Sequence, residues 1–318
     1  MKEESHNNKK ILYTGIKILI LILGALWLFY NWKKEQTFGF LYFVEILQNI
    51  NWLYFAPSIL FYLINWSIET IKWQLLMKRT EEFTFKRGLS AVFAGTTASA
   101  IIPYKMGSYL GRMLFLRTPF KIRAIPASIL GNLLQSSITF FVGLFAAFTI
   151  VDFSKKEKSF YIIFALAFFL LLATLPFYYK KLADFINKGF KKIVKTKKYR
   201  LFSLYERKTI GKAWVYSFLR YCAFTLHFVF ILKAFHIDVS ITDLILCVST
   251  IYFLQSFTPS FIVLDFGVKA SIALGIFTIY TAQEGRLNNI LIFHYLLNSI
   301  VPILLGAIGI LFLRIRNK

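Results

Sequence analysis

The sequence predicts an all-α polytopic membrane protein that forms one integral membrane domain over residues 1–318. Hydrophobic residues make up 57% of the chain, and the mean hydropathy is +0.60. Only 17% of the residues are charged, whereas a soluble domain carries about a quarter. These charges cluster between long apolar runs, as in membrane proteins. The longest polar stretch, residues 180–212, is too short to bury a core, so no soluble domain is expected.

Six apolar runs are long enough to cross a membrane. A spanning helix needs about 20 apolar residues, because the hydrocarbon core is about 30 Å thick. The runs are residues 11–30, 51–77, 124–151, 159–179, 213–235 and 288–313. No small-residue cleavage site follows the first run, so we expect an uncleaved span rather than a signal peptide.

Two further apolar regions are interrupted by helix breakers. Residues 88–102 and 106–116 are separated at Pro103, with Gly107 just beyond the break. Residues 241–257 and 266–280 are separated by a segment that contains Pro259, and Gly267 follows it. We expect these two prolines and two glycines to act as hinge or break positions, and each region to form a helical hairpin.

Charge predicts the orientation of these elements. Residues 180–212 carry twelve Lys and Arg against two acids, which marks a basic cytoplasmic loop, and both termini are basic as well. Lys and Arg flank both ends of the first hairpin, whereas residues 236–243 before the second hairpin contain none. The two hairpins are therefore predicted to be re-entrant from opposite faces of a bacterial-type cytoplasmic (inner) membrane, with both termini cytoplasmic.

The two halves of the chain resemble each other weakly. Pro103 and Pro259 are 156 residues apart, and the same offset aligns Thr84 with Ser240 without gaps. Half-repeats over about 51–151 and 207–313 are one interpretation, and chance alignment of apolar runs is the other. If the repeat is inverted, its broken helices meet in a protein-lined, hydrated cavity, because unpaired backbone is tolerated only there. Lys105, Arg112 and Lys269 would make this cavity attractive to an anion such as a phosphate headgroup.

Four segments carry a resemblance to a known family. They are NWSIETIKWQLL (65–76), ASAIIPYKMGSYLGR (98–112), GNLLQSS (131–137) and TPSFIVLDFGVKAS (258–271). In their order and spacing the chain resembles the flippase-like transmembrane family, which includes the membrane part of the lysylphosphatidylglycerol synthases, or multiple peptide resistance factors. The resemblance implies a lipid-handling role for a stand-alone member without the aminoacyltransferase domain.

This chain departs from the family pattern at three positions. Ser108 stands where the family usually has an acid, which puts a proton- or cation-linked role of that position in doubt. Asp265 replaces the common Glu, and Lys269 replaces the common Arg.

Polar residues inside the apolar segments are the candidate substrate-binding residues. They are Lys105, Arg112, Lys269, Asp265, Glu69, Lys72, Asn132 and Gln135. Each also has a structural interpretation. Arg112 can anchor at the headgroups, the acids and lysines can form ion pairs, and the amides can hydrogen-bond between helices. Arg220 lies near the start of its span and is interpreted as an anchor at the inner interface.

Two functions remain open. The first is a transporter that moves an anionic or zwitterionic lipid headgroup; the second is a non-transporting scaffold or lipid-binding partner of a membrane-associated transferase. No nucleophile–base pair, ATP-binding motif or metal-ligand cluster is found, and His227 and His294 stand alone in apolar runs. An enzyme, a cofactor, a metal and a nucleic-acid partner are therefore not expected, although the net charge is +23.

Overall fold

The computed structural model describes residues 48–102, 106–117, 121–150, 205–257, 262–281 and 284–313. The spans predicted at 11–30 and 159–179, and most of the basic loop, lie outside these residues, as do Pro103, Lys105 and Pro259. The described part of the chain is helical and contains no strand.

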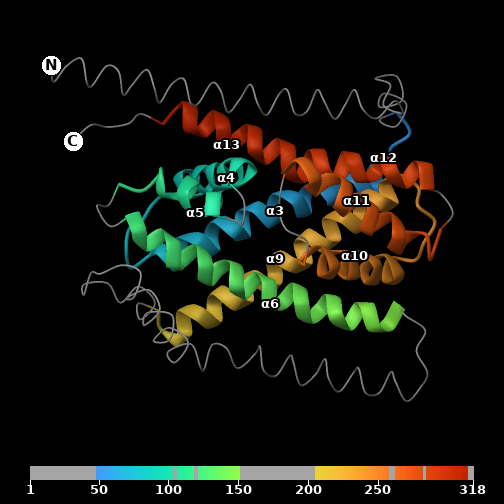
Figure 1. Cartoon of the computed structure of the whole chain (residues 1–318), viewed down its shortest axis with the longest axis horizontal. Coiled ribbons are helices and arrows are strands. Elements are labelled where there is room, and N and C mark those ends of the chain that lie inside the picture. Colours follow the sequence, from blue (N-terminus) through green and yellow to red (C-terminus); the bar gives the residue numbers. More distant parts are fainter. Residues whose placement is uncertain are drawn as a thin grey trace.

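Long helices run side by side along the length of the molecule (Figure 1). α3 (Trp52–Met77) packs against α9 (Arg207–Ala234), and the two are antiparallel because the amide of Asn51 donates to the carbonyl of Ala234 at 3.0 Å. α6 (Ala124–Ile150), preceded by the 3-10 turn η1 (Lys121–Arg123), packs against both. The predicted run 288–313 forms α12 (Glu284–Tyr295), the π-helical turn η2 (Leu296–Ile300) and α13 (Val301–Leu311).

Three of the described helical stretches are long and apolar enough to cross a membrane. They are Ala124–Ile150, Arg207–Ala234 and Asn289–Leu311. α3 is 26 residues long, or about 39 Å at the usual rise, and its second half carries Glu69 and Lys72. The membrane class expected from composition is thus supported by the lengths and apolar character of the helices.

Each interrupted region forms a pair of short helices. The first pair is α4 (Phe85–Ile101) with α5 (Met106–Met113), and the second is α10 (Ile241–Gln255) with α11 (Ile262–Phe277). The pairs occupy opposite ends of the molecule, with α4 and α5 at the left of Figure 1 and α10 and α11 toward the right. α4 and α10 have 17 and 15 residues, so each is shorter than a full span.

Glycines bring α5 against the backbone of α4. A Cβ added at Gly107 would lie 2.1 Å from the carbonyl oxygen of Ala98, and one at Gly111 would lie 2.2 Å from that of Ala94. Two glycines four residues apart let helices approach this closely in membranes. Gly107, expected at the break, is therefore the second residue of α5 and lies in the packing contact between the two helices.

The two hairpins begin with equivalent caps. Thr84 precedes α4 and its hydroxyl accepts from the amide of Arg87 at 3.5 Å, while Ser240 precedes α10 and accepts from that of Asp243 at 3.1 Å. The 156-residue offset relates both the caps and the amides that they bind.

Removing either cap is expected to destabilise its hairpin modestly. Thr84→Ala and Ser240→Ala should each lower the free energy of unfolding by about 1 kcal/mol, because one helix-end amide loses its acceptor. Thermal unfolding in detergent measures the effect, with Ser90→Ala as control, since the hydroxyl of Ser90 donates to the carbonyl of Lys86 within α4 and caps no helix end. Equal melting temperatures for all three variants would contradict a capping role.

Each hairpin also packs on a helix that is distant from it in the sequence. Gly306 in α13 lies against α4, where an added Cβ would be 2.1 Å from the carbonyl oxygen of Phe93 and 2.3 Å from the hydroxyl of Thr97. Gly143 in α6 lies against α10, where an added Cβ would be 2.6 Å from the carbonyl oxygen of Ser249 and 2.3 Å from the Cβ of Phe253. The contacted residues 93 and 97 correspond to 249 and 253 under the same 156-residue offset.

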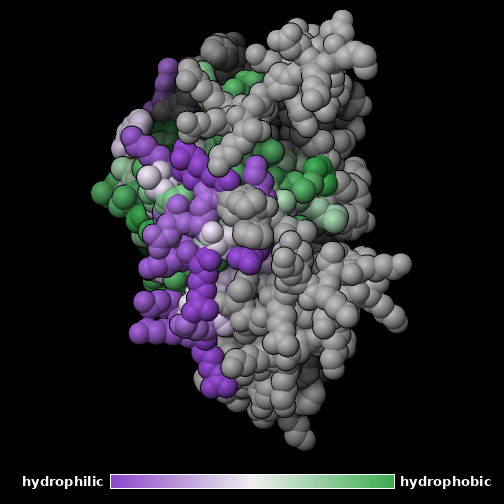
Figure 2. Space-filling model, turned by 90° about the vertical axis from the view of Figure 1, so that its left-hand side faces the viewer, coloured by the Kyte–Doolittle hydropathy of each residue, from purple (hydrophilic) through white to green (hydrophobic). Residues whose placement is uncertain are grey.

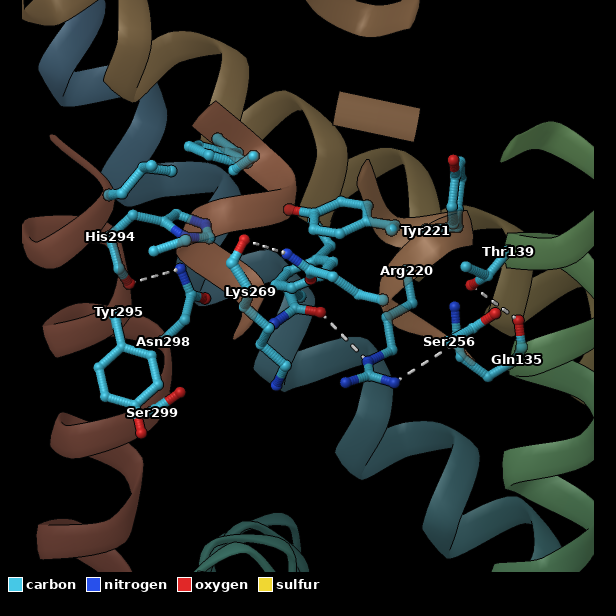
Figure 3. Close-up of a pocket in the computed structure, with 18 of the residues that line it drawn as sticks. Gln135, Thr139, Arg220, Tyr221, Ser256, Lys269, His294, Tyr295, Asn298 and Ser299 are labelled. Atoms are coloured by element: carbon cyan, nitrogen blue, oxygen red, sulfur yellow. Dashed lines mark hydrogen bonds between the residues drawn. The ribbon is translucent and has the colours of Figure 1, made fainter. Parts of the chain in front are cut away.

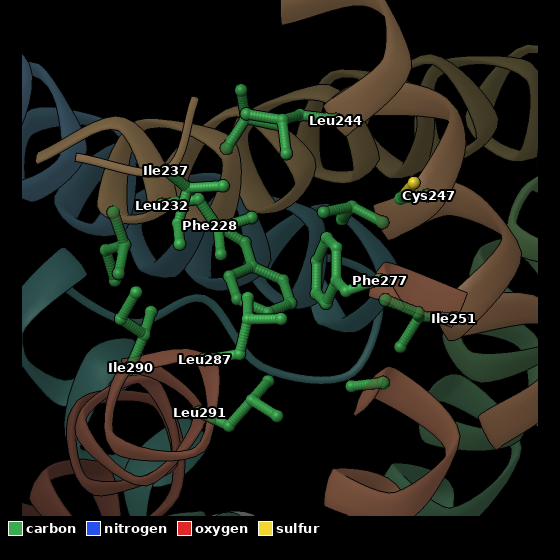
Figure 4. Close-up of a cluster of buried hydrophobic side chains, with 14 of the residues drawn as sticks. Phe228, Leu232, Ile237, Leu244, Cys247, Ile251, Phe277, Leu287, Ile290 and Leu291 are labelled. Atoms are coloured by element: carbon green, nitrogen blue, oxygen red, sulfur yellow. The ribbon is translucent and has the colours of Figure 1, made fainter. Parts of the chain in front are cut away.

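The apolar core of the described part contains two large clusters. One cluster joins α9, α10, α11 and α12, and its buried side chains include Phe228, Leu232, Ile251, Phe277 and Leu287 (Figure 4). A second cluster joins α3, α6 and the start of α9. Polar side chains that lie between these clusters are therefore shielded from water on several sides.

One end of the molecule is strongly hydrophilic. The start of α4, the turn after α5, η1 and the start of α9 lie at the left of Figure 1, and Figure 2 shows hydrophilic residues gathered on this side. Its exposed cations are Lys78, Arg79, Lys86, Arg117, Lys121, Arg207, Lys208 and Lys212. Both ends of the first hairpin therefore lie on the same basic face, in agreement with the charge pattern of the sequence.

Candidate functional site

A buried ion cluster is centred on Glu69 of α3. Its carboxylate lies 2.8 Å from Nζ of Lys72, 2.7 Å from the guanidinium of Arg112 and 3.3 Å from that of Arg220. Lys72 comes from the next turn of α3, Arg112 from α5 and Arg220 from α9, so the cluster ties three helices together. Glu69, Lys72 and Arg112 are 4%, 2% and 8% exposed, which removes most of the solvation that their charges would have in water.

The cluster holds more positive than negative charge. Within the described residues, Glu69 is the single carboxylate paired with the three cations, so the cluster carries a formal excess of two positive charges. Arg112 also lies over the ring of Trp73, 5.0 Å from its centroid, which offsets part of its desolvation. An excess of this size in a buried position favours binding of an anion.

A cavity of about 360 Å³ adjoins the cluster. Arg220 belongs to both, because its guanidinium lines the cavity while it contacts Glu69, Asn65 (3.1 Å) and Gln135 (3.4 Å). Lys72 also approaches the side-chain oxygen of Gln135, at 3.5 Å. Gln135 and Asn65 therefore hold Arg220 in place by accepting from it, and neither neutralises its charge.

The other walls come from the second hairpin and from the region of the π-helical turn. Lys269 of α11 lies on the cavity between Arg220 on one side and His294 and Asn298 on the other (Figure 3). Gln255 at the end of α10 donates to the backbone carbonyl of Lys269 at 3.2 Å, which joins the two helices of the hairpin at this wall. π-Helical turns are frequent at functional sites, and η2 contributes Asn298 and Ser299 here.

A histidine network lies behind this wall. Nδ1 of His227 is 2.9 Å from the backbone oxygen of Ser58, and Nε2 is 2.9 Å from the amide nitrogen of Asn298. The rings of His227 and His294 have centroids 5.6 Å apart, and His294 stacks on Phe228 at 3.8 Å. Nε2 of His294 and the side-chain oxygen of Asn298 are buried and lack a hydrogen-bond partner within the described part.

The structure brings together five of the residues predicted from sequence. Glu69, Lys72 and Arg112 form the ion cluster, and Gln135 and Lys269 line the cavity. Asn132 is half-buried in α6 and is not part of the cavity wall.

The remaining predicted residues fall wholly or partly outside the described atoms. Lys105 is not described, and Asp265 and Gly267 belong to α11 with only their backbone described. The roles predicted for Lys105 and Asp265 in binding, and for Pro103, Pro259 and Gly267 as hinges, remain predictions.

Two interpretations of single residues need correction. Arg220 is not an interfacial anchor, because its guanidinium contacts Glu69, Asn65 and Gln135 inside the bundle. His227 and His294 are not isolated, because they face each other and share the neighbour Asn298. The available sequence signal was the seven-residue spacing of Arg220 and His227, which places both on one face of a helix. No group of three metal-ligating side chains occurs among the described residues.

Comparison with known protein families gives one match. The model of the family described as "Lysylphosphatidylglycerol synthase TM region" matches residues 15–268, which is more than half of the chain. A comparison with curated proteins found no match.

Proposed function

We propose a function for this chain from the premise that it belongs to the lysylphosphatidylglycerol synthase transmembrane family. The proposed function is movement of an anionic or zwitterionic lipid headgroup across the cytoplasmic membrane. The family and the apolar helices indicate a membrane protein with a lipid-related role. The observation that carries the finer proposal is the excess of buried positive charge around Glu69, which reaches the cavity through Arg220.

A phosphate group fits the chemistry of this site. Arg220 and Lys269 approach the cavity from different helices, so a bound phosphate would contact a planar guanidinium and an ammonium group together. The negative charge of the phosphate would offset the excess that Glu69 leaves uncompensated. Only the headgroup requires such a polar path, because the acyl tails of a lipid remain in the bilayer.

The arrangement of the hairpins supports transport by alternating access. Their positions at opposite ends of the molecule, their equivalent caps and their equivalent glycine contacts support an inverted repeat of two re-entrant elements. In such a protein one half moves against the other around a site near the midplane of the membrane. The position of the cavity between the proposed halves supports this mechanism, since α3 and α6 of one half and α9 to α12 of the other contribute to its wall.

The basic face supports an orientation and a second candidate function. Its exposed Lys and Arg support a cytoplasmic location for the start of α4, η1 and the start of α9. The same face would also suit a scaffold that docks an acidic surface of a membrane-associated transferase.

Removal of the cavity cation is expected to slow headgroup movement. The assay uses vesicles that contain phosphatidylethanolamine labelled on its headgroup, and external dithionite quenches label in the outer leaflet only. Arg220→Ala should lower the rate at which label from the inner leaflet becomes accessible to dithionite by about tenfold or more, equivalent to about 1.4 kcal/mol in activation free energy. Arg220→Lys should retain part of the rate, because it keeps the charge and loses the planar fork.

The matched control removes a cation from the exposed side of the same helix. Lys212→Ala should move the headgroup at the wild-type rate, because Lys212 is exposed at the basic face. Equal rates for Arg220→Ala and the wild type would refute the transport proposal. If Arg220→Ala moves the headgroup at the wild-type rate, but substitution of Lys208 and Lys212 abolishes the function of the protein in cells, the scaffold is the better explanation.

A further inference from the structure

The hydrogen bonds of His227 define which of its nitrogens carries a proton. Nδ1 lies 2.9 Å from the carbonyl oxygen of Ser58, and a carbonyl can only accept, so Nδ1 is the protonated nitrogen. The Ser58 hydroxyl, 3.0 Å from the same nitrogen, can accept as well. Nε2 lies 2.9 Å from the amide nitrogen of Asn298, which can only donate. His227 therefore fits its surroundings as the neutral tautomer, in which the lone pair on Nε2 accepts from Asn298.

The orientation of the Asn298 amide is fixed by a second bond. Its nitrogen also donates to the carbonyl oxygen of His294 at 3.3 Å, so a reversed amide would place two acceptors against each other. The side-chain oxygen is left buried without a partner within the described part. A proton added to Nε2 of His227 would face the amide nitrogen, two donors would oppose each other, and the amide would have to rotate. Rotation would satisfy the orphaned oxygen and break the bond to His294.

The charges around this pair link its protonation to the contents of the cavity. Tyr62 of α3 faces His227, with ring centroids 5.4 Å apart, and Lys269 of α11 is close enough to act electrostatically on His294. Tyr252 of α10 lines the same cavity as His294. Arg220 lies two turns before His227 on α9, and within the described residues no carboxylate contacts the pair. Because His227 is fully buried and its described neighbours are neutral or positive, a proton on it is unfavourable, and negative charge that enters the cavity would offset part of this cost.

We propose that His227 is a proton-binding site and that the proton binds together with the anionic headgroup. The amide of Asn298, which lines the cavity, rotates when His227 is protonated. This inference rests on the proposed function, since the headgroup supplies the negative charge. Histidine suits the role because its charge changes between about pH 5 and 8. The step is one proton taken up as the headgroup binds and one proton released as it leaves, so charge and atoms balance.

Calorimetry on the purified protein tests the linkage without requiring transport. Binding of short-chain phosphatidylglycerol is measured at pH 7 in two buffers with different enthalpies of ionisation, which gives the number of protons taken up per ligand. The wild type is expected to take up as much as about one proton, with an affinity that rises by up to about tenfold for each unit of falling pH. His227→Asn should bind the lipid with proton uptake near zero and with an affinity that no longer depends on pH.

Two further variants make the test specific. His236→Asn applies the same change at an exposed histidine in a turn and should behave as the wild type. Asn298→Asp places a carboxylate beside Nε2 and should move the pH dependence to higher pH, because it favours the charged imidazole. Proton uptake in His227→Asn equal to that of the wild type, or no binding of the lipid by the wild type, overturns the inference. Proton-linked binding without movement in vesicles would instead reject transport and leave the proton site standing.

Discussion

Glu69→Gln is expected to lower the free energy of unfolding by about 3–5 kcal/mol, because it leaves two buried cations, Lys72 and Arg112, and the partly buried Arg220 without their carboxylate. The substitution conserves size and shape, so the loss reflects charge rather than packing. Thermal unfolding in detergent, together with the folded fraction on size-exclusion chromatography, measures the effect.

An exposed ion pair supplies the control for this substitution. Glu206 pairs with Arg79, and both side chains are more than half exposed, so Glu206→Gln should change stability by less than about 1 kcal/mol. Glu69→Gln combined with Lys72→Gln should recover part of the loss, because the uncompensated positive charge falls by one. If Glu69→Gln is as mild as Glu206→Gln, the cluster does not have the electrostatic role assigned to it.

The same variant connects stability with binding. Anionic lipid that enters the cavity would offset part of the charge that Glu69 no longer neutralises. Its addition should therefore raise the melting temperature of Glu69→Gln more than that of the wild type. A zwitterionic lipid of the same chain length should produce a smaller difference, because its net charge is zero.

Local patterns in the sequence predicted the positions of most described helices. Hydrophobic run length placed α3 and α6 within one residue at each end, because length and apolarity are properties of a continuous stretch. Thr84 and Ser240 start their helices where the offset between the halves placed them, because capping depends on residues only a few positions apart. No local pattern predicted the π-helical turn at Leu296–Ile300 inside the last apolar run.

The composition of the site depended on packing between distant residues. Glu69 and Lys72 were predictable as a pair because they are three positions apart on one helix. The contact of Glu69 with Arg220 joins positions about 150 residues apart, and an arginine near the start of an apolar run is equally consistent with an interfacial anchor. His227, Asn298 and Ser58 were missed for the same reason, since each belongs to a different helix and none is unusual in its own segment.

Gly143 and Gly306 are expected to be intolerant of side chains, and to a similar degree. Gly143→Ala and Gly306→Ala should each lower the free energy of unfolding by about 1–3 kcal/mol or more, because the new methyl group meets backbone or Cβ atoms at 2.1–2.6 Å that cannot move without separating the helices. Thermal unfolding and the folded yield of each variant in detergent measure this loss.

Open glycines on the same bundle provide the control. Gly211→Ala and Gly275→Ala meet nothing within 4 Å, so both should be neutral or stabilising by as much as about 1 kcal/mol. Gly143 and Gly306 are 163 residues apart, yet they pack on pairs of positions related by 156. Two unrelated contacts would have no reason to tolerate substitution equally, whereas contacts of an internal repeat would. A large loss at Gly306 beside a tolerant Gly143 would therefore count against the repeat, and with it against hairpins that move with the opposite half of the protein.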